Sequence, residues 1–277
     1  MRPRRLAQPG PSLEPRIESV AGQAVPFALS LAPGASLLDS VARAMRAAGF
    51  DSATLELEGG AFGLFAYVLP APAPDAAHAA YYSATHQPVA GARLERACVT
   101  FGRRAGQPWL HCHAVWTEAS GRRGGHVLPE ETVIAAPIAA RAWGLTGIAL
   151  VSEPDAETNF TIFRPVPAAA RTVPGAVRAL ALRIRPNEDL PAALAEAAAR
   201  HGFRHPVLRG SLGSLIGARF ADGAAVEDYA TEMLFTGDGL AIALADMRGE
   251  VHEGVLAPGD NPVCITVEAL MVEAGPA

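Results

Sequence analysis

The sequence predicts an α+β fold made of two copies of one unit, each a mainly antiparallel sheet packed with a helix. Two observations lead to this prediction. Residues 31–50 align without a gap with residues 184–203, so the chain contains an internal repeat. Around each aligned segment, short apolar runs are separated by turns, and one helical pattern occurs early in each copy. This order is typical of an α+β fold and not of a strict alternation of strands and helices.

Each copy is expected to begin with a short apolar strand, at residues 27–31 in the first copy and 180–184 in the second. A turn follows, and a helix is then expected to begin after Ser36 or Asp189. Serine and aspartate are favoured N-caps because their side chains accept hydrogen bonds from the unpaired N–H groups of the first helical turn.

The pattern inside and after the helix is also shared by the two copies. One apolar stripe of the first helix, spaced by four residues, consists of Leu37, Val41 and Met45. Gly49 and Gly202 follow the last helical turn, where a left-handed C-cap favours glycine. A second strand is expected at residues 53–57 and 206–209, each followed by a turn that contains glycine.

The repeat defines the predicted domain boundaries. Residues 125–138 resemble residues 253–268, so the ends of the two copies also correspond. We therefore expect a disordered tail at residues 1–20, a first domain at 21–165 and a second domain at 173–277. The intervening residues 166–172, rich in proline and alanine, are the predicted linker.

The composition excludes several kinds of chemistry. The 277 residues contain no lysine, so all 23 basic residues are arginine, and neither a lysine Schiff base nor a phosphate loop ending in Gly-Lys can form. A net charge of -5 argues against a surface that coats nucleic acid. Three cysteines are too few for a disulfide framework or a four-cysteine zinc site.

No segment of the sequence has the pattern of a leader or a membrane span. Proline-rich sequence follows the basic start, where a signal peptide needs an apolar run. The longest apolar region, residues 132–151, is interrupted by Pro137 and Arg141. We therefore expect a soluble cytoplasmic protein without membrane contact.

Two histidines on one predicted strand form the first part of a candidate metal site. Apolar residues alternate in the segment Trp-Leu-His111-Cys-His113-Ala-Val-Trp, which is typical of a strand. Side chains two residues apart on a strand point to the same face, so His111 and His113 lie side by side. Cys112 points to the opposite face and is expected in the core.

A third histidine follows the next turn. His126 comes after Gly124 and Gly125, and a hairpin would bring it near the first pair, although the sequence leaves the register open. Three histidines with an open fourth position are typical of catalytic zinc, and iron, nickel, manganese and cobalt also remain candidates. The alternative is that His111, His113 and His126 are packed or surface residues without a metal.

The order of these motifs resembles a known family. A Leu-x-Pro-Gly turn before the first helix, a glycine after the next strand, His-x-His, a glycine-rich turn, Gly-Gly-His and a valine-rich last strand occur in this order. Together they resemble the plants-and-prokaryotes conserved domain, called the PCC or PPC domain. The resemblance covers both copies, about four-fifths of the chain, and Gly-Gly-His after His-x-His is its most specific part.

The resemblance implies a PCC-like α+β fold, a homotrimer and, in prokaryotic members, a divalent metal, with zinc expected first. Its ligands would be His111, His113 and His126. The family resemblance implies no particular reaction. By analogy with plant members of the family, it also implies an association with DNA. This chain differs from the family because it lacks the Arg-Gly-Arg core of an AT-hook. It also lacks the histidines in the second copy, where Ala241, Ala243 and Gly254 take their places.

Further polar residues flank the histidine strand, and each has a plain alternative as a solvated turn residue. Acid–base candidates are Glu118, Glu130 and Glu131, and a possible pocket loop contains Tyr81, Tyr82 and His86. A carboxylate substrate could be held by Arg103, Arg104, Arg122 or Arg123. No Gly-x-Ser-x-Gly elbow supports serine hydrolysis.

Three functional hypotheses remain. The first is a metal-dependent protein that binds or acts on a small molecule at the three-histidine site, with catalytic residues unassigned. The second is a DNA-associated regulator, which the acidic charge and the missing AT-hook make unfavourable. The third is an assembly module in which the metal is structural.

Overall fold

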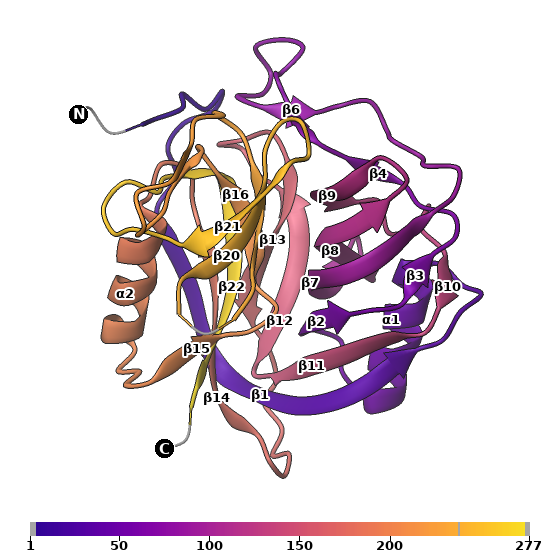
Figure 1. Ribbon diagram of the computed structural model, residues 1–277. Helices are drawn as coiled ribbons and strands as arrows, with labels where there is room; N and C mark the ends of the chain where they lie inside the picture. The colour runs from indigo at the N-terminus through magenta and orange to yellow at the C-terminus, as the bar shows by residue number, and fades with distance from the viewer. Residues whose placement is uncertain (1–3, 238, 275–277) are drawn as a thin grey trace.

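The two halves of the chain meet at β1 (Ile17–Leu31) in the computed structural model, which describes residues 4–237 and 239–274. Residues 23–31 of β1 pair antiparallel with β11 (Ile138–Thr146) of the first half. Residues 17–24 of the same strand pair antiparallel with β14 (Val177–Ile184) of the second half. β1 therefore joins both halves into one continuous sheet, and it crosses the base of the molecule in Figure 1.

The first half forms one side of this sheet. Its strands pair antiparallel in the order β9, β8, β7, β2 and β11. The small pair β5–β6 is separate, and β12 pairs with β13 and, over two residues, parallel with β7. The remaining strands of this half are β2 (Ala53–Glu58), β3 (Ala61–Phe62), β4 (Tyr67–Val68), β5 (Pro70–Ala71), β6 (Tyr81–Tyr82), β7 (Ala92–Arg104), β8 (Gln107–Glu118), β9 (Gly121–Val127), β10 (Ile134–Ala136), β12 (Ile148–Pro154) and β13 (Thr161–Pro167).

The second half continues the sheet from β14 through β22, β16, β19 and β20 to β21, again with antiparallel pairs. The predicted fold class is confirmed, because both halves are mainly antiparallel sheet and each carries one helix among the residues that the structure describes. The other strands of this half are β15 (Pro206–Leu208), β16 (Leu212–Leu215), β17 (Ala218–Arg219), β18 (Ala225–Val226), β19 (Glu232–Phe235), β20 (Ala241–Ala245), β21 (Val251–Val255) and β22 (Val263–Glu273).

The two helices begin where their capping residues predict. In α1 (Leu37–Ala48) the Ser36 hydroxyl accepts a hydrogen bond from the Asp39 N–H at 3.0 Å. In α2 (Leu190–Arg200) the Asp189 carboxylate accepts one from the Ala192 N–H at 3.2 Å. Gly49 ends α1 with a φ of 79°, a left-handed conformation that disfavours residues with a Cβ. No helix within the described part of the chain is long and apolar enough to cross a membrane.

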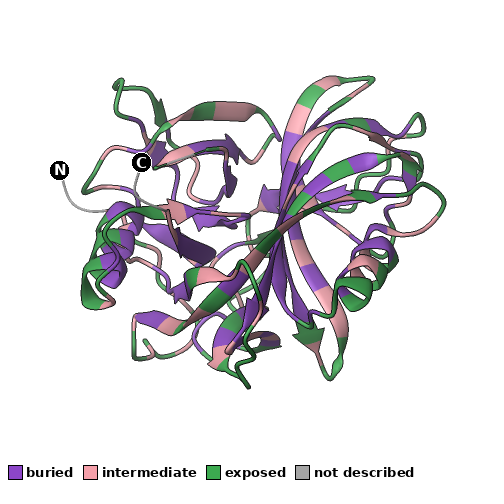
Figure 2. Cartoon of the chain, turned by 90° about the horizontal axis from the view of Figure 1, so that it is seen from below, coloured by how far each residue is buried: buried purple, intermediate pink, exposed green. Residues whose placement is uncertain are grey.

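Each half has its own apolar core, and a third core lies between them. The first core collects the predicted stripe of α1, whose three members are fully buried. The third core combines Trp143 and Phe163 of the first half with Leu270 and Val272 of the second half. Figure 2 shows buried residues running through both sides of the molecule. The halves therefore share buried surface in addition to strand β1.

The chain around the predicted boundaries differs from expectation. Residues 1–20 were expected to be disordered, but β1 already begins at Ile17, and residues 1–3 lie outside the described residues. Within residues 4–16, the Leu6 N–H donates to Asn187 Oδ1 at 2.8 Å, and the Gln8 side chain donates to the Cys264 carbonyl at 2.9 Å. These bonds hold the segment against the second half, and composition alone does not reveal them. Strand β13 also extends to Pro167, into the predicted linker.

Candidate metal centre

The three predicted histidines lie together on the hairpin of β8 and β9. Strand alternation places His111 and His113 on one face of β8, while Cys112 is fully buried in the core of the first half, as predicted. The register that the sequence left open pairs His113 directly with His126. The ring centroids lie 4.5 Å apart for His111 and His113, 4.9 Å for His111 and His126, and 5.3 Å for His113 and His126.

Gly124 explains how β9 packs closely against the second half. Its N–H donates to the carbonyl of Gly249 at 3.1 Å. A Cβ at position 124 would lie 3.1 Å from the Cβ of Ala245, so a larger residue would push the two segments apart. The Gly-Gly-His motif therefore combines a ligand candidate with a backbone that can approach the second half.

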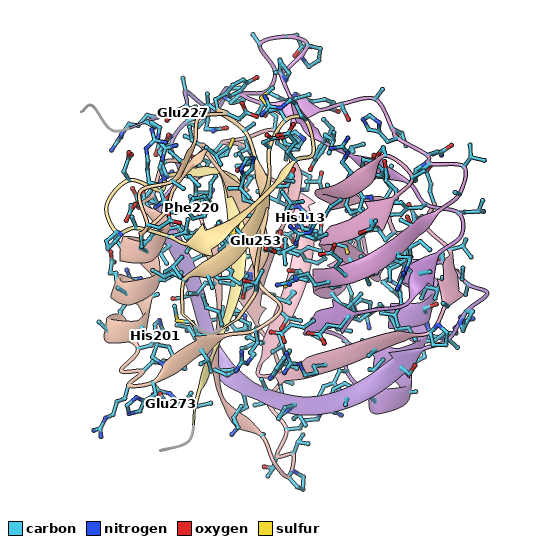
Figure 3. The ribbon with its side chains drawn as sticks, in the orientation of Figure 1. His113, His201, Phe220, Glu227, Glu253 and Glu273 are labelled. Carbon is cyan, nitrogen blue, oxygen red and sulfur yellow. The ribbon has the colours of Figure 1, made fainter. Side chains whose placement is uncertain are left out.

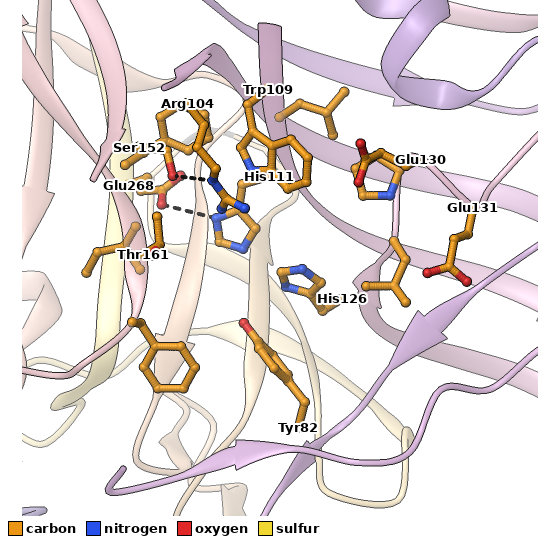
Figure 4. Close-up of a pocket in the computed structure, with 16 residues that line it drawn as sticks. Tyr82, Arg104, Trp109, His111, His126, Glu130, Glu131, Ser152, Thr161 and Glu268 are labelled. Atoms are coloured by element: carbon orange, nitrogen blue, oxygen red, sulfur yellow. Dashed lines mark hydrogen bonds and ion pairs between the residues drawn. The ribbon is translucent and has the colours of Figure 1, made fainter. Parts of the chain in front are cut away.

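The second half supplies two acidic side chains to the site, and the sequence analysis did not identify them. Glu268 on β22 places Oε1 3.1 Å from His111 Nδ1, as drawn in Figure 4. Glu232 on β19 places Oε2 2.9 Å from His113 Nε2. Both carboxylates are over nine-tenths buried, and Figure 3 shows His113 at the junction of the two halves. A glutamate within an otherwise apolar strand was the available signal, because buried acidic residues are rare unless paired.

The hydrogen bonds around the site orient two imidazole rings. The Met233 carbonyl can only accept, so His113 Nδ1 donates to it at 3.0 Å. Glu268 likewise favours a proton on His111 Nδ1. This leaves the two Nε2 atoms facing each other at 2.9 Å. Two lone pairs at this distance would repel each other. The repulsion is removed by a proton on His113 Nε2, which also lies 2.9 Å from Glu232 Oε2, or by a metal ion bound to both nitrogens.

The pKa values of the histidines differ in direction. At His113 burial opposes the charged form, but the Glu232 carboxylate outweighs it and the pKa is raised. At His126 burial, followed by the neighbouring His111 and His113, lowers the pKa well below its usual value. Glu232 therefore favours the protonated form of His113, whose proton a bound metal would displace, and the surroundings of His126 favour the neutral imidazole that binds metals.

The ring nitrogens of the three histidines suit a transition metal as ligands. Each of His111, His113 and His126 offers a ring nitrogen, and these three nitrogens lie within 4.8 Å of one another. His126 Nδ1 is buried and has no hydrogen-bond partner among residues 4–237 and 239–274. Buried polar atoms are normally paired, so an unpartnered imidazole nitrogen beside two oriented ones suits an ion that accepts nitrogen ligands. Two carboxylates would offset the charge of that ion.

A cavity of about 310 Å³ opens beside the histidines. Its lining includes His111, His126 and Glu268 together with the predicted candidates Tyr82, Arg104, Glu130 and Glu131 (Figure 4). Apolar walls come from Trp109, Phe160 and Phe163. The volume lies at the low end of the range for small-molecule sites, roughly 300–1,000 Å³.

The other predicted polar residues do not line this cavity, and most of them have partners of their own. Glu118 accepts from Trp116 Nε1 at 3.0 Å, and the His86 ring stacks on Tyr67. Arg103 pairs with Asp51 at 2.7 Å. The remaining ones are Tyr81, beside Phe160, Arg122, which pairs with Glu95 and Glu253, and Arg123 on β9.

The strand register of the second half differs in detail from the alignment of the two copies. Ala243 on β20 pairs with Glu253, whereas Gly254 pairs with Ile242. His252 Nε2 on β21 lies 3.2 Å from Asp246 Oδ2. With Glu250 these two residues form a second group of potential ligand atoms, but Asp246 already accepts hydrogen bonds from backbone N–H groups.

Comparisons with known proteins find similarity only among solved structures. No protein-family model matches the chain, and no curated protein matches it. A plant- and prokaryote-conserved (PPC) protein from Pyrococcus horikoshii matches with 13% identity and a TM-score of 0.43, over 53% of this chain and 96% of that chain. The metal-containing protein AF0104 from Archaeoglobus fulgidus matches with 15% identity and a TM-score of 0.42, over 50% and 92%.

A third structure, described as a candidate DNA-binding protein from Ralstonia eutropha JMP134, matches with 16% identity and a TM-score of 0.35, over 50% of this chain and 89% of that chain. The structural neighbours of this chain thus include a PPC protein, and each of these matches covers about half of this chain and most of the other chain.

Proposed function

We propose that the protein binds a divalent metal at His111, His113 and His126 and uses this site to bind or transform a small molecule. The observation that supports it most is the pair of Nε2 atoms facing each other at 2.9 Å beside the ring of His126, whose Nδ1 has no hydrogen-bond partner in the described part of the chain. Zinc fits three imidazoles with an open position, and the nearby Glu232 would also suit metals that prefer an oxygen ligand.

The chain's own residues would support such a site in defined ways. Glu268 and the Met233 carbonyl hold the rings of His111 and His113 in fixed orientations. The cavity gives a small molecule access to His111 and His126. A divalent ion bound here supplies Lewis-acid activation of water or of a carbonyl group, which makes hydrolysis the first reaction class to screen.

Metal content per chain tests the proposal directly. Elemental mass spectrometry of untagged, natively purified protein should find about one equivalent of a divalent metal per chain. His111→Ala and His126→Ala should each remove most of it, whereas the control His86→Ala should not, because His86 stacks on Tyr67 away from the site. A metal content unchanged in both site variants would disprove the proposal, and two equivalents would point to an additional site in the second half.

Two alternative functions make different experimental predictions. A structural metal predicts that chelation dissociates the trimer expected from the family resemblance, measured by light scattering; an unchanged mass favours the small-molecule function. A DNA-associated role predicts duplex binding that persists at moderate salt, although the net charge of -5 is unfavourable for it.

We also propose that the chain divides into two domains at residues 166–172 and that the protein is cytoplasmic.

A further inference from the structure

Arg104 places a partly buried positive charge in the wall of the cavity. Its Nε donates to the Ser152 hydroxyl at 3.1 Å, and its guanidinium carbon lies 3.9 Å above the centre of the Trp109 ring. Among residues 4–237 and 239–274, no carboxylate forms an ion pair with it. A partly desolvated guanidinium held in this way is prepared to bind an anion with its two terminal nitrogens.

Arg103, the neighbouring residue, shows the contrast. Its side chain is 47% exposed and forms an ion pair with Asp51 at 2.7 Å. Alternation along β7 sends Arg103 and Arg104 to opposite faces, and only Arg104 lines the cavity. Burial lowers the pKa of Arg104 although acidic groups, including Glu130 and Glu268, act in the opposite direction. These carboxylates thus influence Arg104 through space without pairing with it.

We infer that the cavity binds a small monocarboxylic acid with an apolar body, whose carboxylate pairs with Arg104 and whose other end lies beside His111 and His126. A planar carboxylate matches the fork of a guanidinium in a bidentate pair. The apolar walls formed by Trp109, Phe160 and Phe163 suit an aromatic or aliphatic body. This inference rests on the proposed function, because it names the ligand class of the same site.

The charges around the cavity favour a carboxylate over a phosphate. The lining contains one arginine and three glutamates, Glu130, Glu131 and Glu268. Among the lining side chains one is positive and three are negative, so away from the histidines the wall disfavours a dianion, whereas a monoanion needs only the single fork of Arg104. The small cavity volume of about 310 Å³ also limits the ligand to a compact acid.

Calorimetric titration of the full chain with matched probes tests this inference. Benzoate and phenylacetate should bind the native protein, benzamide and phenyl phosphate should bind much more weakly, and the control R103Q should behave like the native protein. R104Q should weaken benzoate binding by about tenfold to one hundredfold, because a charge-assisted pair is lost. R104K, which keeps the charge but not the fork, should give an intermediate loss and guards against a folding defect in R104Q.

The outcomes separate this inference from the proposed function. Carboxylate binding that is equal in the native protein and in both Arg104 variants would overturn the inference, as would a failure of both carboxylates to bind. Metal content measured on the same samples stays at the native value in R104Q if only the carboxylate contact is lost. Arg104-dependent binding in protein that holds no metal would support the ligand class while refuting the metal site.

Discussion

Glu268 and His111 lie on strands from opposite halves of the chain, yet their Oε1 and Nδ1 atoms are 3.1 Å apart. Glu232 and the Met233 carbonyl reach His113 from the same side. The second half has no histidine equivalent to His111, but it contributes the groups that orient the histidines of the first half. This contact assigns the second repeat a role in the candidate centre.

Removing the Glu268 carboxylate should weaken metal binding. Groups that hydrogen-bond to metal-binding histidines typically contribute about tenfold to one hundredfold in metal affinity. Glu268→Ala should show a loss of this size in a competition titration against a chromophoric chelator, and Glu268→Gln, which keeps an acceptor oxygen, a smaller one. Glu253→Gln is the matched control, because Glu253 is a surface partner of Arg122. Equal affinities of Glu268→Ala and the control would refute the orienting role.

Removing the metal should lower the thermal stability of the native protein. A ligand at about 100 times its dissociation constant stabilises the folded state by about 2.7 kcal/mol, so chelation should lower the Tm by several degrees. Scanning calorimetry before chelation, after it and after adding zinc back measures this effect. His111→Ala should show no response to the chelator, and an identical response would place the stabilising metal elsewhere.

Acid should destabilise the protein through Asp155. This buried carboxylate accepts hydrogen bonds from Arg183 at 2.7 Å and Arg185 at 3.0 Å. Burial raises its pKa, but the two arginines outweigh burial and lower the pKa from 3.8 to about 2. A lowered folded-state pKa gives stability that is present above the unfolded value and is lost as pH falls through the folded value.

The expected contribution of Asp155 at neutral pH is about 2 kcal/mol. Urea unfolding from pH 6 down to pH 2 should therefore show a loss of that order below about pH 4. Asp155→Asn should be less stable at pH 6 and should lose this part of the acid dependence, whereas Glu153→Gln, half-exposed, should keep it. Parallel pH profiles of Asp155→Asn and the native protein would show that other groups carry the effect.

The N-cap of α1 should have a measurable effect on stability. Ser36 Oγ satisfies the Asp39 N–H, and Ser36→Ala removes this bond at a cost of about 1 kcal/mol in the free energy of unfolding. Ser36→Asp should restore most of the loss, because aspartate caps equally well. Equilibrium unfolding in urea measures both variants, and a destabilised Ser36→Asp would show that the hydroxyl has another role.

Local patterns predicted the local elements well. Ser36 and Asp189 cap their helices, Gly49 adopts a left-handed conformation, and Cys112 is buried opposite the histidines. Each depends on neighbours a few residues away in the chain. The ordered segment of residues 4–16 was missed because its hydrogen bonds reach Asn187 and Cys264, which no local pattern reveals.

The sequence by itself determined the α+β class, the repeat, the shared face of His111 and His113 and the loss of histidines from the second copy, because these depend on short periodicities and direct alignment. Only the tertiary structure decided that His126 lies opposite His113, that Glu232 and Glu268 reach the histidines, and that Arg104 faces the cavity. The physical reason is strand register and sheet curvature: these set which distant residues meet, and they depend on the packing of both halves together.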